Sequence, residues 1–484
     1  MKLNITYALK KFLSITAFTF FGAILGVIIL YIYLMQNRPD LHPWHTTSLE
    51  EEFTTRSASK VKTFPEYLAQ EESLFNELQD KIYNNWTDKR EHQLIRYDPT
   101  SMANPSLYEV NWNRSFELEQ AKPTAGVLLL HGLSDSPYSL RTLAKTLHQQ
   151  GNYVIGLRMP GHGTIPSGLV ETSWQDMAAS VKIAARHLSD QINSKPLHII
   201  GYSMGAAQAV NYSLDALQDE TLPETDSLVL ISPAIGVSAV AAFAIWQSRL
   251  STIPGLEKLA WNSIGPEYDP YKYTSFAVNA GDLMYRLTLA IGTKLELLQK
   301  KKRTAEFPKV LAMLSAVDAT VSVSAVLDYL LDKLNNENNE LVVFDINRYK
   351  YILPFVSNDP GEGLKKLFTR ENLNFRLSLL TNESENSYKV LESNKERNNT
   401  LSKKQLDLVW PENIYSLSHV ALPFSVTDSL YGAEPENEAG LHIGRMSPRG
   451  ERNVLSVPAS DSLRLRYNPF YLYLQQRIVN FLAE

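Results

Sequence analysis

Gly201-Tyr202-Ser203-Met204-Gly205 is the stretch that decides how this sequence folds. The residues before it, His198-Ile199-Ile200, are typical of the end of a buried strand, and Met204-Gly205-Ala206-Ala207 begins a helical pattern. A serine between two glycines at a strand-to-helix turn forms the nucleophile elbow, a tight turn that directs the hydroxyl out above the sheet. The other interpretation is an ordinary turn serine, but the strand and helix on either side favour the elbow. We therefore take Ser203 as the candidate nucleophile.

Strands and helices are expected to alternate on both sides of this turn. We expect strands at 125–130, 153–157, 197–201, 227–231, 310–314 and 341–344, and helices at 138–149, 174–192, from 204 onward and at about 323–334. Such alternation requires crossover connections and gives a mainly parallel sheet. The pattern stops after Ser232, and residues from about 237 to 306 are expected to form a helical cap. The predicted fold class is α/β, a mainly parallel sheet flanked by helices with a helical cap insertion.

A serine nucleophile needs a general base, and in hydrolases with this elbow the acid and then the histidine follow the serine in the chain. The sequence has ten histidines, and of these His419 and His442 follow Ser203. We prefer His419, which lies in the loop-like segment YSLSHVA after the last expected strand. The alternative is His442, in the glycine-flanked segment GLHIG. If it is not the base, His442 is expected to be a surface or packing histidine.

The acid is expected in the turn after a late strand. Asp318 stands just beyond the strand in VLAMLSAVD, where it would orient the imidazole and stabilise the imidazolium. An aspartate here could also cap the following helix, and the two roles are compatible. Asp345, which follows the strand at 341–344, is the alternative.

The tetrahedral intermediate of acyl transfer needs hydrogen-bond donors for its oxyanion. We expect two backbone N–H groups, from Met204 after the nucleophile and from Leu133 in the loop HGLSDSP after the first buried strand. His131 in this loop and His162 in the turn PGHG precede the nucleophile. We therefore expect both histidines to be structural.

With these segments in place, the sequence resembles the α/β-hydrolase superfamily, and in particular its monoacylglycerol lipase-like and carboxylesterase-like branch. The matching segments are LLLHGLSDSP, GLRMPGHG, HIIGYSMGAA, SAVDATV and SLSHV, which together span residues from about 125 to 421. The resemblance implies an α/β-hydrolase fold, with Leu133 as oxyanion donor, Ser203 as nucleophile, Asp318 as acid and His419 as base. It also implies that residues 237–306 are the cap.

The N-terminus contains a long apolar stretch. Residues 12–35, FLSITAFTFFGAILGVIILYIYLM, are 24 residues without a charge. A helix rises about 1.5 Å per residue, so this stretch is long enough to cross a hydrocarbon core of about 30 Å. No small-residue cleavage pattern follows, which favours an uncleaved anchor over a signal peptide. Lys2, Lys10 and Lys11 precede the span and Arg38 follows it, so we expect a cytoplasmic N-terminus and an extracytoplasmic catalytic domain, periplasmic if the source is bacterial.

These patterns divide the chain into three parts. Residues 1–35 are expected to be the membrane anchor, 36–120 a membrane-proximal helical or irregular segment, and 121–484 the hydrolase domain. Between the expected acid and base the chain is longer than is usual in the family. We therefore expect a long insertion at about 347–415, of which the polar part at 382–407 would lie on the surface.

Composition excludes several classes of function. The formal net charge is −5, which does not favour a nucleic-acid partner. The sequence has no cysteine, so disulfides, thiolate metal sites and cysteine nucleophiles are excluded. The expected chemistry needs no metal and no organic cofactor.

The sequence predicts a membrane-anchored serine carboxylic ester hydrolase, an esterase or lipase that works through an acyl-enzyme. An acyl ester of a lipid or lysolipid is the preferred substrate, because the anchor would hold the enzyme beside lipids and the cap contains apolar residues: Val240, Ala241, Phe243, Ile245, Trp246, Leu250 and Leu256. An acyltransferase or thioesterase would use the same three side chains and is the alternative. A catalytically silent, membrane-tethered binding protein is the alternative of another class.

Overall fold

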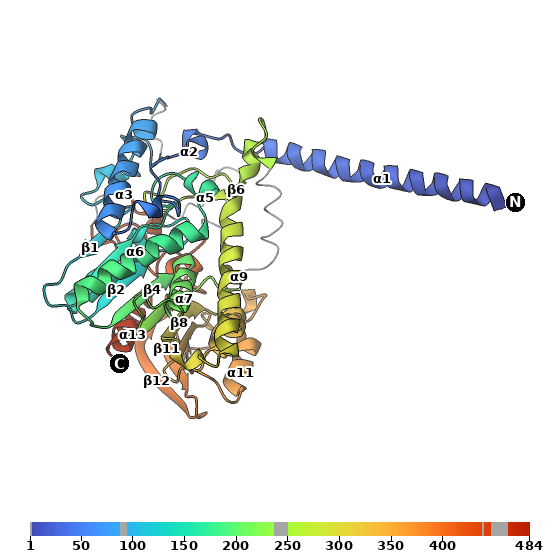
Figure 1. The fold of residues 1–484 in the computed structure, drawn as a ribbon. Coiled ribbons are helices and arrows are strands. Elements are labelled where there is room, and N and C mark those ends of the chain that lie inside the picture. The colour runs from blue at the N-terminus through green and yellow to red at the C-terminus, as the bar shows by residue number, and fades with distance from the viewer. Residues whose placement is uncertain (1, 88–93, 237–249, 438–439, 447–462) are drawn as a thin grey trace.

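A ten-stranded sheet forms the centre of the molecule (Figure 1). The computed structural model describes residues 2–87, 94–236, 250–437, 440–446 and 463–484. The strand order is β1-β3-β2-β4-β5-β8-β9-β10-β11-β12. The strands are β1 (Phe116–Leu118), β2 (Gly126–Leu130), β3 (Tyr153–Leu157), β4 (Leu197–Tyr202), β5 (Ser227–Ile231), β8 (Lys309–Ser315), β9 (Glu340–Phe344), β10 (Arg376–Asn382), β11 (Lys389–Lys395) and β12 (Leu401–Val409). Neighbours from β3 to β10 pair in parallel, whereas β1, β11 and β12 pair antiparallel to their neighbours.

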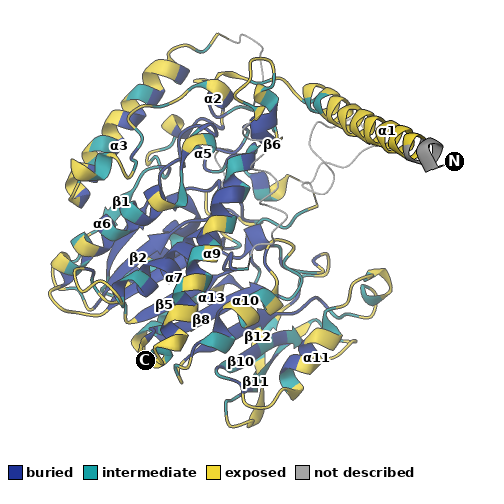
Figure 2. Ribbon diagram, turned by 45° about the vertical axis from the view of Figure 1, so that its right-hand side comes forward, coloured by how far each residue is buried: buried dark blue, intermediate teal, exposed yellow. Residues whose placement is uncertain are grey.

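Helices cover both faces of this sheet. On one face lie α6 (Trp174–Ile192), α7 (Met204–Ala216), α9 (Val278–Lys300), α10 (Val323–Tyr329) and α11 (Gly361–Thr369), and on the other lie α4 (Arg141–Gln149) and α13 (Tyr471–Ala483). Successive strand side chains point to opposite faces. In β2, accordingly, Leu128 and Leu130 pack into the hydrophobic core on the side of α6 and α7. Val127 and Leu129 pack into the core on the side of α4 and α13. Figure 2 shows the central strands buried between these layers. The predicted fold class is confirmed.

The segment expected as a long insertion extends the sheet. Residues 347–415 contain α11 and the strands β10, β11 and β12, and β10 pairs in parallel with β9. The polar stretch at 382–407, expected on the surface, forms most of β11 and β12, and its β-strand character was not predicted. β12 is exposed along almost its whole length and carries Lys403 and Lys404. An edge strand that faces water needs no apolar run, and charges on it hinder further strand pairing, so its sequence pattern is weak.

The described part of residues 237–306, the segment expected to form the cap, is mainly α9 (Val278–Lys300). Before it lie a 3₁₀ turn at Glu257–Ala260 and a small two-stranded sheet of β6 (Trp261–Ser263) and β7 (Phe276–Ala277), separate from the main sheet. Leu250 is exposed and Leu256 is half-buried. The expected apolar cap residues from Val240 to Trp246 lie outside the described residues.

The N-terminal helix α1 (Lys2–Gln36) projects away from the body of the molecule (Figures 1 and 2). Its part Leu9–Gln36 is long and apolar enough to cross a membrane, judged by length and composition, and none of its most apolar stretch is buried. The chain then continues through α2 (Pro43–Thr46) and α3 (Phe64–Leu78). Phe64 and Tyr67 of α3 belong to the same hydrophobic core as the helices of the first face.

The C-terminal helix α13 is part of the core. Leu474, Ile478 and Phe481 are buried in the cluster that contains Val229, Leu311 and other residues of the central strands. The role of the residues after about 425 could not be inferred from the sequence. The structure shows that its last helix covers one face of the sheet.

We predict that Leu474→Ala lowers the free energy of unfolding by about 2–5 kcal/mol, because it leaves a cavity under α13. Leu472, on the same helix, is 75% exposed and is the matched control. Leu472→Ala should change the stability by no more than about 0.5 kcal/mol. Urea denaturation of the full chain in detergent, followed by tryptophan fluorescence, measures both. Equal effects of the two substitutions would contradict the packing of α13.

Candidate active site

Ser203 occupies a strained turn between β4 and α7. Its backbone has φ 55° and ψ −115°, a conformation that residues with a side chain rarely adopt. A Cβ at Gly201 would lie 2.4 Å from Ala206, and a Cβ at Gly205 would lie 2.0 Å from the Leu130 carbonyl oxygen. Both positions therefore require glycine. The Ser203 N–H donates to the Ile231 carbonyl at 2.9 Å, which holds the turn to the end of β5.

The structure brings Ser203, Asp318 and His419 together. His419 Nε2 lies 2.9 Å from Ser203 Oγ, and His419 Nδ1 lies 2.8 Å from Asp318 Oδ2. Ser203 follows β4 and Asp318 follows β8, so both lie at the carboxyl edge of the parallel sheet, and His419 begins a short 3₁₀ turn. Ser203 and His419 are buried, and the Asp318 carboxyl group is inaccessible to solvent.

The surroundings of Asp318 keep its carboxyl group ionised. Burial acts to raise the pKa of Asp318, but the hydrogen bond and charge of His419 and the N–H groups of Val321 and Thr320 outweigh it, and the net pKa is lowered. These N–H groups donate to Asp318 Oδ1 at 3.0 and 2.8 Å. A carboxylate accepts only, so His419 carries its proton on Nδ1 and leaves Nε2 free to accept the Ser203 proton.

The expected oxyanion donors lie close to the nucleophile. A Cβ at Gly205 would overlap the carbonyl oxygens of Leu130 and His131. The N-terminus of α7 therefore packs against the end of β2, where the loop with Leu133 begins. Within the described part of the chain, the N–H groups of Leu133 and Met204 make no hydrogen bond to a protein acceptor. Such donors are suited to an oxyanion.

His131 and His162 brace this loop. The Met159 N–H donates to His131 Nε2 at 3.0 Å, which requires a neutral ring whose Nδ1–H donates to the Gly132 carbonyl at 2.9 Å. His162 packs against His131, with their ring centroids 4.8 Å apart. Burial lowers the pKa of both imidazoles, that of His162 to about 4. Both rings are therefore neutral supports at pH 7.

The alternative residues are engaged elsewhere. His442 Nδ1 lies 2.9 Å from the Ser429 carbonyl oxygen. Asp345 forms an ion pair with Arg348 and accepts a hydrogen bond from Thr381 Oγ1 at 2.7 Å. Among the two pairs of candidates, the structure thus brings His419 and Asp318 to Ser203.

Sequence reasoning missed a contact between the segment expected to form the cap and the loop expected to supply an oxyanion donor. Lys272 Nζ lies 2.9 Å from Asp135 Oδ2, and the Tyr273 N–H donates to the Ser134 carbonyl at 2.8 Å. Asp135 is in the motif HGLSDSP, but its partner is 137 residues away. No local sequence pattern predicts an ion pair between residues so far apart in the chain.

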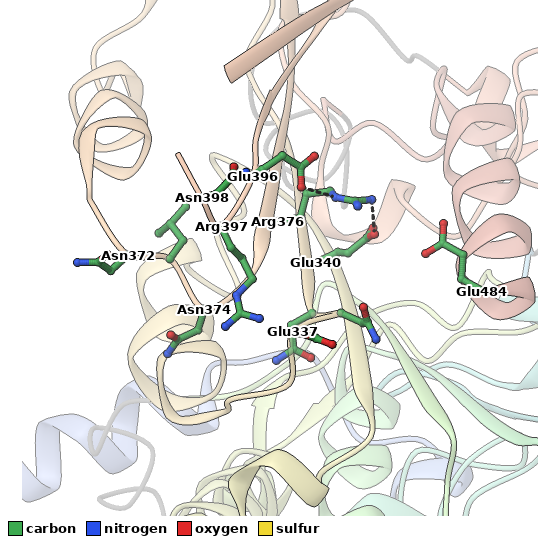
Figure 3. A pocket seen from close by; sticks show the side chains of 12 residues that line it. Glu337, Glu340, Asn372, Asn374, Arg376, Glu396, Arg397, Asn398 and Glu484 are labelled. Carbon is green, nitrogen blue, oxygen red and sulfur yellow. Dashed lines mark hydrogen bonds and ion pairs between the residues drawn. The ribbon is translucent and has the colours of Figure 1, made fainter. Parts of the chain in front are cut away.

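Two cavities lie away from Ser203, Asp318 and His419. One, of about 640 Å³, lies at the amino ends of β9 and β10, where Arg376 bonds to Glu340 and Glu396 (Figure 3). The other, of about 800 Å³, lies between α11 and the strands β10 to β12. Neither is lined by Ser203, Asp318 or His419. Within the described ranges, no group of three or more His, Asp or Glu side chains is arranged to hold a metal ion.

Part of the chain matches a known protein family. Residues 121–268, which include β2 to β5 and Ser203, match the family described as serine aminopeptidase, S33. The chain's sheet and elbow are those of the α/β-hydrolase fold. The resemblance noted in the sequence is therefore confirmed.

The chain is also similar to individual lipases. A thermostable monoacylglycerol lipase from Bacillus sp. (strain H-257) is 32% identical over 117 residues, which are 24% of this chain and 44% of the relative. The match thus spans less than half the length of that lipase. A structure of the metagenome-derived lipolytic enzymes LipS and LipT covers 49% of this chain and 89% of its own, at 19% identity and a TM-score of 0.38. The monoacylglycerol lipase of Paleococcus ferrophilus covers 48% and 87%, at 19% identity and a TM-score of 0.36.

We predict a loss of stability at mildly acidic pH that depends on His162. Its folded-state pKa of about 4 lies below the usual histidine value of 6.5, so the neutral ring stabilises the fold fully above pH 6.5. This contribution falls as the pH drops from 6.5 toward 4, because the unfolded chain then binds the proton more readily. The melting temperature of His162→Gln should therefore fall less than that of the wild type between pH 7 and pH 4.5, measured by differential scanning calorimetry.

His148→Gln on α4 is the control for this experiment. His148 is half-buried and its Nε2 lies 2.9 Å from the Glu119 carbonyl oxygen. Its substitution should leave the acid-induced decrease in melting temperature as large as in the wild type. A His162→Gln variant with an unchanged decrease would refute the assignment of a neutral, buried His162.

Proposed function

We propose that this protein is a serine carboxylic ester hydrolase with Ser203 as nucleophile, His419 as general base and Asp318 as the acid that orients it. The observation that carries the proposal is the continuous line of hydrogen bonds from Asp318 through His419 to Ser203, at 2.8 and 2.9 Å. The strained elbow and the match to a serine peptidase family support it.

The reaction follows from this geometry. Ser203 Oγ attacks the ester carbonyl carbon while His419 Nε2 takes its proton, and the Asp318 carboxylate stabilises the imidazolium. The N–H groups of Leu133 and Met204 donate to the oxyanion. The intermediate then expels the alcohol, which receives the proton from His419 and leaves an acyl group on Ser203. Water, deprotonated by His419, attacks the acyl-enzyme carbonyl carbon. The bond between this carbon and Ser203 Oγ then breaks, His419 returns the proton to Ser203 Oγ, and the carboxylic acid leaves.

We further propose a lipid acyl ester as the substrate and α1 as a membrane anchor. The similarity of a 117-residue stretch of the chain to a monoacylglycerol lipase supports the substrate class. The exposed, apolar α1 supports the anchor. Lys10 and Lys11 before the apolar stretch and Arg38 after it favour a cytoplasmic N-terminus, with the catalytic domain on the opposite side of the membrane.

Labelling with a fluorophosphonate probe tests the nucleophile and the base. The full chain in detergent should be labelled, whereas Ser203→Ala should not be labelled and His419→Ala should be labelled far more slowly. His442→Ala is the matched control and should be labelled like the wild type. An unlabelled His442→Ala together with a normally labelled His419→Ala would overturn the choice of base. No labelling of a folded wild type would favour a silent binding protein.

The acid is tested by asparagine substitutions. Asp318→Asn should lower kcat for a p-nitrophenyl ester by roughly 10⁴-fold, because an amide favours the wrong tautomer of the base. Asp345→Asn should leave kcat per active site near that of the wild type, because Asp345 pairs with Arg348. Active sites are counted by fluorophosphonate titration. Product analysis with an added alcohol acceptor distinguishes a hydrolase from an acyltransferase.

A further inference from the structure

The end of α1 is tied to one edge of the cap. We define the cap edge as residues 250–263, which comprise the 3₁₀ turn at Glu257–Ala260, β6 and the residues before them. Arg38 Nη1 donates to the carbonyl oxygens of Trp261 and Asn262, each at 2.7 Å. Figure 1 shows α1 leaving the body of the molecule beside β6.

A lysine of the cap edge completes this connection from the other side. Lys258 Nζ donates to the carbonyl oxygens of Gln36 and Arg38 at 3.1 and 2.9 Å, and it lies 2.9 Å from Asp40 Oδ1. Gln36 Nε2 donates to the Gly255 carbonyl. A cation at a helix C-terminus satisfies carbonyls that have no partner within the helix and interacts favourably with the helix dipole.

The cap edge is also fixed to the rest of the protein. Trp261 is buried, and its ring meets His45 edge-on at 4.9 Å between centroids. Trp261 pairs with Ala277 of β7, directly before α9. His45 Nε2 lies 2.9 Å from Ser275 Oγ. The end of α1 is therefore held against a packed part of the cap.

The chain contacts the candidate active site both before and after the cap edge. Before it in the chain, the Ala234 N–H donates to the Ser203 carbonyl at 3.1 Å. After it, the Tyr273 N–H donates to the Ser134 carbonyl in the oxyanion loop. The cap edge thus belongs to a segment that connects the end of α1 with both sides of the site.

The position of α1 determines what the cap edge would meet. If the apolar stretch ending at Gln36 crosses a bilayer, Gln36 and Arg38 lie at the level of the lipid headgroups. The residues they contact must lie at the same level. There the cap edge exposes Leu250 and Ile253, which are 41% and 48% accessible. Two exposed apolar side chains are ordinary on a protein surface and do not by themselves indicate a partner. Here the cap edge that carries them is hydrogen-bonded to the end of α1, and this connection points to the lipid surface as the partner.

We propose that the cap edge docks on the bilayer surface, with Leu250 and Ile253 among the lipid headgroups, and that Arg38 and Lys258 hold it there. The active site is thereby kept at a fixed orientation to the membrane, and an acyl ester enters it from the bilayer. This inference rests on the proposed anchoring by α1. It adds which face of the catalytic domain meets the lipid.

The absence of cysteine from the sequence permits a direct test. Ile253→Cys in the full chain is labelled with an environment-sensitive fluorophore and reconstituted in phosphatidylcholine vesicles, with or without spin-labelled quencher lipid. Leu401→Cys is the matched control, because Leu401 is 66% exposed on β12, at the opposite end of the molecule from α1 (Figures 1 and 2). The label at residue 253 should show blue-shifted emission and quenching by the lipid, and the label at residue 401 should show neither. Leu250→Cys replaces Ile253→Cys if the latter does not fold, as judged by fluorophosphonate labelling.

Two further measurements distinguish a failure of the proposed anchor from a failure of the proposed docking. Flotation of the vesicles reports anchoring: a chain that does not float refutes the anchor and this inference with it. A chain that floats while the label at residue 253 behaves like that at residue 401 refutes the docking alone. In the Ile253→Cys background, Lys258→Ala should reduce the quenching toward that at residue 401, and Lys258→Arg should preserve it. Quenching unaffected by Lys258→Ala would refute the role of Lys258.

Discussion

The structure depends on one close contact, the approach of the first turn of α7 to the carboxyl end of β2. Gly205 lies so near the Leu130 carbonyl that any side chain would collide with it, and Ser203 adopts a positive φ to make the turn. A conformation of this kind costs of order 1–3 kcal/mol and persists only where its surroundings enforce it. Here β4 is buried between β2 and β5, and the Ser203 N–H is bonded to β5. The strained turn thus places the Ser203 hydroxyl and the Met204 N–H at the edge of the sheet where the loop with Leu133 begins.

Buried charges connect the outer segments to this centre. Arg158, at the end of β3, pairs with Glu52 and Glu71, each at 3.0 Å, and so joins the segment before the hydrolase core to the sheet. Arg141 pairs with Asp428 at 2.7 Å and joins α4 to the chain after the candidate base. Removing one member of a buried ion pair costs about 3–5 kcal/mol, because the other charge stays buried without compensation. The segments on either side of the α/β core are therefore structural parts of one catalytic unit.

Much of the central sheet could be predicted because its strands are buried on both faces. The apolar runs of β3 and β5 and the amphipathic α6 have the bounds that the sequence predicted. β11 and β12 were not predicted as strands, because edge strands exposed to water lack an apolar run. The packing of α13 was not predicted either, since an apolar helix near the end of a chain does not indicate which surface it covers. Contacts such as Lys272 with Asp135 join residues far apart in sequence and leave no local pattern.

The sequence by itself determined the fold class, the strand-to-helix turn at Ser203 and a short set of candidate partners, because the elbow needs glycine two residues before and two residues after the serine, and the acid and base follow it in the chain. Tertiary structure alone decided which candidates meet. It placed His419 and Asp318 at hydrogen-bonding distance in line with Ser203, and it paired Asp345 with Arg348 instead. It also attached the end of α1 to the cap through Arg38 and Lys258. The physical reason is that strand burial and turn sterics act between neighbours in the chain, whereas a hydrogen bond across 101 or 216 residues depends on how the whole chain packs.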